Sequence, residues 1–227
     1  MPIASDFPYP RRYNSLRLLG FDYANTTALF FITMLAENGR PIFADFTLAK
    51  SILATLLDPR TTARIRIHAY TLLPDHFHLL AGVRDADKKL SVSLGLFKSY
   101  TTQKYWKRGH ELAEGESIAP APIDFGTRSE KETKQLLQSI IEWRATLRPE
   151  AIKLKKWPKV RTEFFLAKRL WQTRFHEHII RNDADLRETI EYIAMNPVKR
   201  GYVSRPQYYP FTAFNFCEEE FWPQPHV

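Results

Sequence analysis

The stretch Ala63–Val83, ARIRIHAYTLLPDHFHLLAGV, decides how this chain folds. Its first half, Ala63–Leu73, alternates apolar and polar residues as a half-buried strand does. Pro74-Asp75 predicts a short connection, because both residues favour turns. The second half, His76–Val83, is apolar apart from two histidines and predicts the hairpin partner of the first strand.

Working outward from this hairpin, the sequence predicts further elements on both sides. A strand at Ala28–Leu35 and helices at Thr47–Pro59 and Ser91–Arg108 are followed by a strand or turn at Leu170–Arg181 and a helix at Asn182–Pro197. The expected helix boundaries are Thr47 as an N-cap, Pro59 as a stop, Ser91 near a cap, Asn182 or Asp183 as a start and Pro197 as an end. This order predicts an α+β fold, a ferredoxin-like antiparallel sheet with helices packed on one face.

Residues 109–168 differ from their surroundings and predict an insertion into a single domain that spans residues 1–227. The segment Gly109–Glu130 lacks periodicity and contains glycine and proline, so we expect a loop. The segment Ser129–Leu147 predicts a helix. The following stretch, Lys153–Arg174, is basic and contains interspersed aromatic residues.

The composition favours a basic protein of the reducing cytoplasm. The net charge is +8 and the sequence pI is about 9.5, which favours an anionic partner, most often nucleic acid, over a merely basic soluble protein. The single cysteine, Cys217, excludes a disulfide framework and a cysteine-rich zinc site. We find no apolar signal core at the N-terminus and no run of about 20 apolar residues. We therefore expect a cytoplasmic monomer or homodimer with no membrane partner.

His76 and His78 point to the same face of the predicted strand, because side chains alternate along a strand. Two neutral imidazoles on one face are a natural pair of metal ligands. Two surface histidines on a half-exposed strand are the alternative, since a histidine pair at this spacing is common. No zinc-protease HExxH motif accompanies them, nor does the deaminase pattern.

The helix at Asn182–Pro197 offers the groups that such a pair would need. Tyr192 and Asn196 are four residues apart and therefore share a helix face. Asn196 brings an amide oxygen and Tyr192 a phenol. A core aromatic and a helix-ending residue are the alternative, and Pro197 places Asn196 at the helix end, because the residue before proline avoids helical angles.

Two blocks of the chain resemble the REP-associated tyrosine transposases, which are single-tyrosine HUH transposases. They are LLPDHFHLL at Leu72–Leu80 and LWQTRFHEHIIRNDADLRETIEYIAMNPVKRGYV at Leu170–Val203, and RRYN at Arg11–Asn14 accompanies them. The resemblance implies a ferredoxin-like sheet that carries two histidines, and a helix with one tyrosine nucleophile followed one turn later by a polar metal ligand. The region 109–168 is longer than in compact members of the family.

Transferred to this chain, the resemblance implies His76, His78 and Asn196 as metal ligands and Tyr192 as the nucleophile. It implies that the protein cleaves single-stranded DNA, at hairpin-forming repeats, through a 5′-phosphotyrosine intermediate that a 3′-hydroxyl can reverse. The divalent ion, Mg²⁺ or Mn²⁺, would polarise the phosphate.

Basic residues near these motifs are the expected contacts with single-stranded or hairpin DNA. Cations can follow a phosphate backbone while aromatic rings stack on bases. The pattern predicts contacts at Lys153, Lys155, Lys156 and Lys159, and at Lys199 and Arg200 just past the predicted helix. The resemblance implies further contacts at Arg11, Arg12 and Tyr13, which match the N-terminal segment with which the family reads DNA beside a hairpin. The interleaved aromatic residues are Trp157, Phe164, Phe165 and Trp171, and for Trp171 we favour a place in the core.

A second histidine pair, His176 and His178, lies in the later block. His178 is a position of the family motif, and we interpret it as structural rather than as a fourth ligand.

Two other functions compete with DNA cleavage. One is a non-catalytic nucleic-acid-binding domain that kept the fold. The other is a zinc hydrolase of small substrates, which fits poorly because no general-base carboxylate accompanies the histidines.

Overall fold

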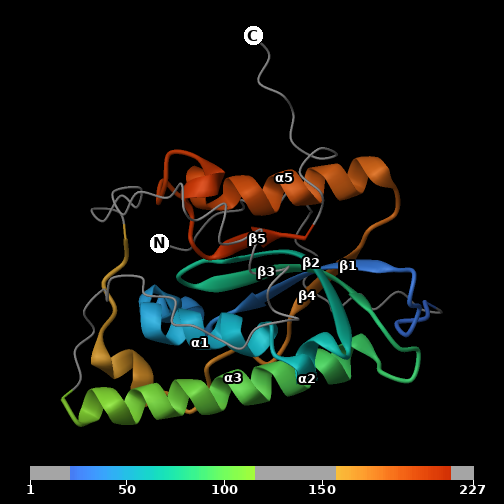
Figure 1. The fold of residues 1–227 in the computed structure, drawn as a ribbon. Helices are drawn as coiled ribbons and strands as arrows, with labels where there is room; N and C mark the ends of the chain where they lie inside the picture. The colour runs from blue at the N-terminus through green and yellow to red at the C-terminus, as the bar shows by residue number, and fades with distance from the viewer. Residues whose placement is uncertain (1–20, 116–156, 216–227) are drawn as a thin grey trace.

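The computed structural model describes residues 21–115 and 157–215 of the chain. The strands within these ranges are β1 Leu29–Leu35, β2 Ile65–Leu72, β3 His76–Val83, β4 His176–Ile179 and β5 Thr212–Phe214. The α-helices are α1 Phe46–Leu56, α2 Pro59–Thr62, α3 Leu90–Ala113 and α5 Asp183–Lys199. Short 3-10 helices lie at Glu37–Gly39 (η1), Ile42–Ala44 (η2), Thr162–Leu166 (η5) and Pro206–Tyr208 (η6). The sheet forms the middle layer, with α5 on one side and α1, α2 and α3 on the other (Figure 1).

The strands form one sheet in the order β4-β1-β3-β2-β5, and every pair in it is antiparallel. β2 and β3 form the hairpin that the sequence predicted, and β3 begins at His76. α1 connects β1 to the hairpin and α3 connects the hairpin towards β4, so the first four strands have a ferredoxin-like arrangement. The α+β class predicted from the sequence is confirmed.

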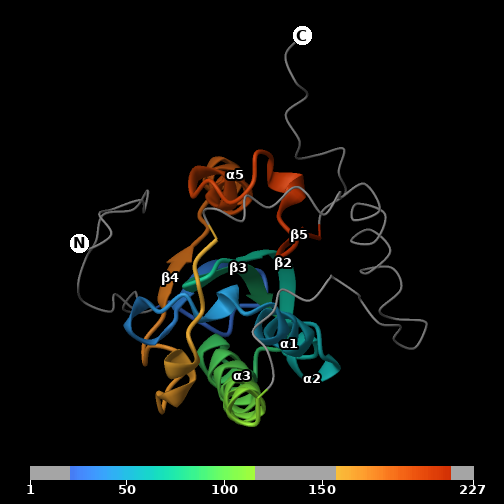
Figure 2. The ribbon, with the colours of Figure 1, turned by 90° about the vertical axis from the view of Figure 1, so that its left-hand side faces the viewer.

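Helices cover both faces of the sheet, so the expectation of helices on one face was wrong. Phe77 and Leu79 of β3 point into the main core, which contains the buried residues of α1 and α3. His78 and Leu80 alternate with them and face residues of α5. Figure 2 shows α5 on the opposite side of the sheet from α1 and α3. A simple ferredoxin-like domain has helices on one face of its sheet, and α5 is an addition to that layer. It encloses a second buried region on the face of the sheet that carries His78.

Two helix boundaries near α1 differ from the sequence prediction. The Asp45 carboxylate accepts a hydrogen bond from the backbone N–H of Leu48 at 2.7 Å, so Asp45 is the N-cap and Thr47 lies in the first turn. Pro59 does not simply end this helix. It opens α2 behind the N-cap Asp58, because proline suits the first helical position, where no N–H is needed.

α3 is longer than the predicted helix Ser91–Arg108; its N-cap position is Lys89, and Ser91 lies near this cap as predicted. The helix continues to Ala113, so the first five residues of the predicted insertion belong to it. Burial of Arg108 and Leu112 holds this extra length against the core. The rest of the predicted loop, and the predicted helix Ser129–Leu147, lie outside the described residues.

α5 runs through Pro197 to Lys199, so Asn196 lies inside the helix and not at its end. A proline near the last turn removes a single backbone hydrogen bond, and the turn still closes. The N–H of Arg200 donates to the Asn196 carbonyl at 3.0 Å, and the N–H of Tyr202 donates to the Pro197 carbonyl at 3.0 Å. The prediction that Pro197 ends the helix was therefore wrong, while Asn182 is confirmed as the N-cap.

The aromatic tail after α5 returns to the sheet as β5, a strand that the sequence analysis did not predict. It pairs with β2 through Ala69, Tyr70 and Thr71. The Tyr209 hydroxyl donates to the Leu72 carbonyl at 2.8 Å, and burial raises the pKa of Tyr209 well above its ordinary value. The tail thereby protects one edge of the sheet.

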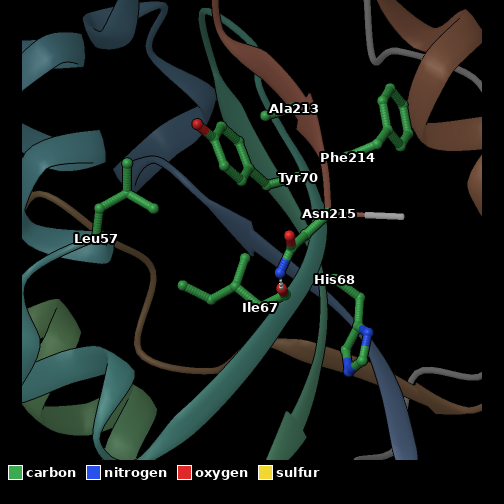
Figure 3. A pocket seen from close by; sticks show the side chains of 7 residues that line it. All are labelled: Leu57, Ile67, His68, Tyr70, Ala213, Phe214 and Asn215. Atoms are coloured by element: carbon green, nitrogen blue, oxygen red, sulfur yellow. Dashed lines mark hydrogen bonds between the residues drawn. The ribbon is translucent and has the colours of Figure 1, made fainter. Parts of the chain in front are cut away.

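A small hollow lies beside β5, with a volume of about 10 Å³ (Figure 3). Its lining is mostly apolar, and the Asn215 amide donates to the Ile67 carbonyl at 3.2 Å. A space of this size holds one water at most, so it is no substrate site.

Among the helices that the structure describes, none combines the length and the apolar character that crossing a bilayer requires.

Candidate active site

Two histidines of β3 form the centre of the candidate site. His76 and His78 are 5% and 0% exposed, and their ring centroids lie 4.6 Å apart in an edge-on arrangement. Both lie on the sheet face that α5 covers, as the alternation of the strand predicted. Burial of two imidazoles side by side requires that their nitrogens find partners.

Each imidazole has one nitrogen occupied by a neighbouring oxygen. His76 Nδ1 lies 2.6 Å from Asp75 Oδ1, and His78 Nδ1 lies 2.8 Å from Thr33 Oγ1. When Nδ1 carries the proton and donates it to such an acceptor, Nε2 keeps its lone pair for a ligand. The Asp75 carboxylate can only accept, so it favours this tautomer at His76, and the Thr33 hydroxyl is compatible with it at His78.

Asn196 approaches the histidines from α5. Its side-chain Nδ2 lies 3.1 Å from His78 Nε2, and the residue is 5% exposed. With a lone pair on Nε2 the amide nitrogen donates to the imidazole, and a metal ion shared by the two side chains would require the amide to present its oxygen instead. The structure thus brings His76, His78 and Asn196 together, as the resemblance implied.

The electrostatic environment keeps His78 neutral. Burial, with the nearby His76 and Arg200, lowers the pKa of His78 well below its ordinary value. Burial acts to raise the pKa of Asp75, but its hydrogen bond with His76 and the nearby charges lower it overall. The result is a neutral imidazole at His78 and an ionised carboxylate behind His76, which suits cation binding.

Tyr192 lies on the same side of α5 as Asn196. Its ring centroid is 5.1 Å from that of His78 and 5.8 Å from that of Phe31, both in edge-on contact. Lys199 Nζ lies 5.8 Å from the ring centroid. The side chain is half-buried, so the sheet orients the ring while part of it stays accessible.

A row of polar side chains crosses the sheet through His78, and sequence reasoning missed it. Backbone pairing joins His176 to Thr33, Thr33 to His78, His78 to Thr71 and Thr71 to Thr212. The Thr212 hydroxyl donates to Thr71 Oγ1 at 2.6 Å. In the sequence these threonines resemble ordinary strand residues, and only the register of the sheet reveals that they share a row.

His178 has a partner of its own away from the candidate metal ligands. Its Nε2 lies 2.8 Å from both carboxylate oxygens of Asp185 in the first turn of α5. Asp185 also accepts the backbone N–H of Arg181 at 3.0 Å. This contact fastens β4 to the start of α5 and agrees with the structural interpretation of His178.

The expected DNA contacts are only partly described by the structure. Arg11, Arg12, Tyr13, Lys153, Lys155 and Lys156 lie outside the described residues. Lys159 is exposed, Lys199 is exposed beside Tyr192, and Arg200 is half-buried near Asp75 and His78. Lys199 and Arg200 are thus the expected contacts that adjoin the candidate site.

The aromatic residues expected to stack on bases lie mostly inside the protein. Trp157 stacks on Phe46, with ring centroids 5.4 Å apart, and its Nε1 donates to the Ala44 carbonyl. Phe165 and Trp171 are 7% and 3% exposed. The sequence favoured a place in the core for Trp171 only, but Trp157 and Phe165 also pack against the core. The sequence could not show this, because it does not reveal which rings the sheet and α3 cover.

The donor set fits a hard or borderline divalent ion. Two ligands at right angles, each about 2.1 Å from a common octahedral ion, are about 3.0 Å apart. The 3.1 Å between His78 Nε2 and the Asn196 amide matches that spacing when the amide oxygen faces the imidazole. In the described part of the chain no three His, Cys, Asp or Glu side chains cluster as ligands, so a metal ion held here by three side chains would need the amide as one of them.

A ferredoxin-like sheet that presents two histidines to a tyrosine-bearing helix is the arrangement that the resemblance to single-tyrosine HUH transposases implied. The "REP-associated tyrosine transposase" of Escherichia coli (strain K12) is 41% identical over 63 residues, covering 26% of this chain and 38% of that protein. The "Putative REP-associated tyrosine transposase" of Haemophilus influenzae (strain ATCC 51907 / DSM 11121 / KW20 / Rd) is 25% identical over 147 residues, covering 65% of this chain and 57% of that protein. These matches confirm the relationship to REP-associated tyrosine transposases.

The chain is also similar to a solved structure. A solved chain described as "Structure of the REP associates tyrosine transposase bound to a REP hairpin" has a TM-score of 0.46 and 20% sequence identity, covering 90% of this chain and 80% of that one. No model of a protein family matches the sequence. The chain spans less than two thirds of the length of the curated relatives that it matches.

Proposed function

We propose that this protein is a metal-dependent nickase and strand transferase of single-stranded DNA, with Tyr192 as the nucleophile. The observation that carries the proposal is the convergence of His76, His78 and Asn196 next to the Tyr192 ring. The family name of the curated relatives supports the same class of activity. A hairpin-forming repeat is the substrate that the relationship favours.

In the proposed reaction the Tyr192 oxygen attacks a backbone phosphorus atom and loses its proton. The new bond joins the tyrosine to the 5′-phosphate of the downstream strand, and the upstream 3′ oxygen departs and gains a proton. A 3′-hydroxyl of another strand reverses the step and restores the phosphodiester bond. The bond energy is kept in the protein–DNA link, so no nucleotide cofactor is needed.

The surrounding residues have separate tasks in this scheme. His76, His78 and Asn196 would hold Mg²⁺ or Mn²⁺, which neutralises the charge that develops on the phosphate. Asp75 and Thr33 hold the two imidazoles in orientation through Nδ1. Lys199, whose Nζ lies 5.8 Å from the centre of the tyrosine ring, supplies a positive charge next to the phenol, where a DNA phosphate would lie. Edge-on contacts with Phe31 and His78 fix the ring for attack.

The test uses one hairpin-bearing single strand in two labelled forms with Mn²⁺. With a 3′ label the wild-type protein should shift the label to the mobility of a protein adduct on a denaturing gel. With a 5′ label it should give a shortened, unattached fragment. Tyr192→Phe should lose both products, and EDTA should abolish them. Tyr100→Phe, a half-buried tyrosine of α3 on the opposite side of the sheet, is the matched control and should behave as wild type.

DNA binding without either product in the wild-type protein would sink the proposal and favour a non-catalytic binding domain. An adduct that persists in Tyr192→Phe would place the nucleophile elsewhere.

A further inference from the structure

The segment 159–174, which runs through η5 to the start of β4, carries a strip of exposed cations away from the candidate active site. We call Lys159, Arg161, Lys168, Arg169 and Arg174 the basic strip; all five are exposed. Glu163 is the one acidic residue in the range 159–174, and it is also exposed. The strip therefore presents a net positive charge along one stretch of backbone.

Trp106 of α3 lies beside this strip and is 47% exposed, which is unusual for so large a ring. Its Nε1 donates a hydrogen bond to the Lys168 carbonyl at 3.3 Å. This bond ties the indole to the backbone of the strip and limits its rotation, while nearly half of the side chain remains open to solvent. A fixed, open indole among cations is suited to stacking on an unpaired base.

The backbone of the strip is held by side chains of α3 and by Arg40, which follows η1. The Tyr105 hydroxyl lies 2.8 Å from the Ala167 carbonyl, Arg40 Nη2 donates to the Arg169 carbonyl at 2.8 Å, and Lys98 Nζ donates to the Thr173 carbonyl at 3.1 Å. These contacts use the carbonyls of the segment and leave the side chains of its cations directed outward. Next to Trp106, Lys107 is exposed and pairs with Glu111 at 3.6 Å.

The strip is continuous with the histidine end of the sheet. The N–H of Gln172 donates to the Leu35 carbonyl at 2.9 Å, and that of Glu37 donates to the Leu170 carbonyl at 2.8 Å. The N–H of Ala36 in turn donates to the Asp75 carbonyl at 2.9 Å. The backbone of the strip at Leu170 and Gln172 therefore lies two strand spacings from Asp75, the residue before His76. This distance is roughly 10 Å.

We propose that the basic strip and Trp106 form a second binding surface for single-stranded DNA, on which phosphates lie along the cations and one unpaired base stacks on the indole. The proposal rests on the proposed function, because a strand held at Tyr192 would reach this surface around the β4 edge of the sheet. The stacked base must be unpaired, so the surface distinguishes single-stranded from duplex DNA.

The test measures the affinity of the full chain for a fluorescein-labelled single strand without a hairpin, in EDTA so that no cleavage takes place. Trp106→Ala should weaken binding by about 5- to 150-fold, the range expected for one stacked base. Trp106→Phe keeps a ring and should recover part of the affinity. Leu166→Ala, which removes an exposed apolar side chain from η5 nearby, is the matched control and should bind as wild type.

Salt dependence separates stacking from charge. Trp106→Ala should leave the slope of log affinity against log salt unchanged, because no phosphate contact is lost. Lys168→Gln with Arg169→Gln should reduce the slope by about 0.7 for each phosphate contact removed from a single strand. A duplex of the same sequence should bind Trp106→Ala and wild type equally.

Equal affinity of Trp106→Ala and wild type for the single strand would overturn the proposal, even where Tyr192 forms its adduct. Equal weakening for single strand and duplex would overturn it as well, since it would show a loss of fold or of general charge. A loss specific to the single strand in a protein that forms no adduct would support this surface and reject the nickase.

Discussion

The hydroxyl of Thr33 lies 2.8 Å from Nδ1 of His78, in the buried centre of the sheet, although the two residues are 45 positions apart in the chain. We expect this contact to select the tautomer that leaves Nε2 of His78 available. Thr33→Val keeps the shape of the side chain and removes the acceptor. Mn²⁺ affinity, measured by titration calorimetry on the DNA-free protein, should fall by about 10–100-fold.

The control for this change is Thr33→Ser, which keeps the hydroxyl and should bind Mn²⁺ nearly as wild type does. Thr33→Val also leaves a buried N–H without an acceptor, so its free energy of unfolding should fall by about 1–3 kcal/mol. A valine variant with unchanged Mn²⁺ affinity would show that Thr33 only packs.

The Asn196 amide is the third expected metal ligand, and changing its chemistry tests this assignment. Asn196→Ala removes the donor and should weaken Mn²⁺ binding more than the loss of Thr33 does, because a direct ligand is lost. Asn196→Asp supplies a carboxylate oxygen, the kind of donor that hard cations prefer, and should bind Mn²⁺ at least as tightly as wild type. If both variants bind like the wild type, Asn196 is only a hydrogen-bond partner of His78.

The sequence predicted the histidine strand well because its determinants are local. The Pro74-Asp75 connection fixed its start, and alternation fixed which side His76 and His78 share. The helical position of Asn196 was missed because the bias against helical angles before Pro197 is weaker than the packing of α5 on the sheet. β5 is three residues long and gave no periodic signal. The role of Thr33 depends on sheet register, which no local pattern specifies.

The buried ion pair between Arg108 and Asp45 connects α3 to the start of α1. The atoms Arg108 Nη2 and Asp45 Oδ2 are 3.2 Å apart, and the two side chains are 5% and 2% exposed. Arg108→Met leaves the buried carboxylate without its cation and should lower the free energy of unfolding by about 3–5 kcal/mol. Urea denaturation followed by circular dichroism measures the loss. Lys107→Met breaks only the exposed pair with Glu111 and should cost about 0–1 kcal/mol.

Stability should fall as the pH falls from about 7 to 5, in EDTA. The pKa of His78 is lowered by burial, and burial with Arg66 and Arg84 also lowers the pKa of His68. Below the ordinary histidine pKa of about 6.5 the unfolded chain binds protons that the folded chain does not, so the free energy of unfolding decreases. The limit is about 1.4 kcal/mol per pH unit for each group.

Urea midpoints at several pH values check this dependence. His68→Gln should reduce the slope of stability against pH. Asp75 affects the stability at lower pH than the histidines do. Its pKa is lowered in the folded protein, so the stabilisation that it provides is lost only as the pH falls to about 4 and below. A stability that is flat between pH 7 and 5 would contradict the lowered pKa values, because it would mean that the folded and unfolded chains bind equal numbers of protons in this range.

The two faces of the sheet differ in how much apolar surface holds their helices, and this difference affects motion. Among the described residues, α5 rests on a small cluster of Phe31, Ala69, Leu80, Ile190 and Ile193, whereas α1 and α3 share the main core. Local unfolding requires least free energy where the fewest apolar contacts break. The backbone amides of α5 should therefore exchange hydrogen for deuterium faster than those of α3, which would let Tyr192 be uncovered without global unfolding.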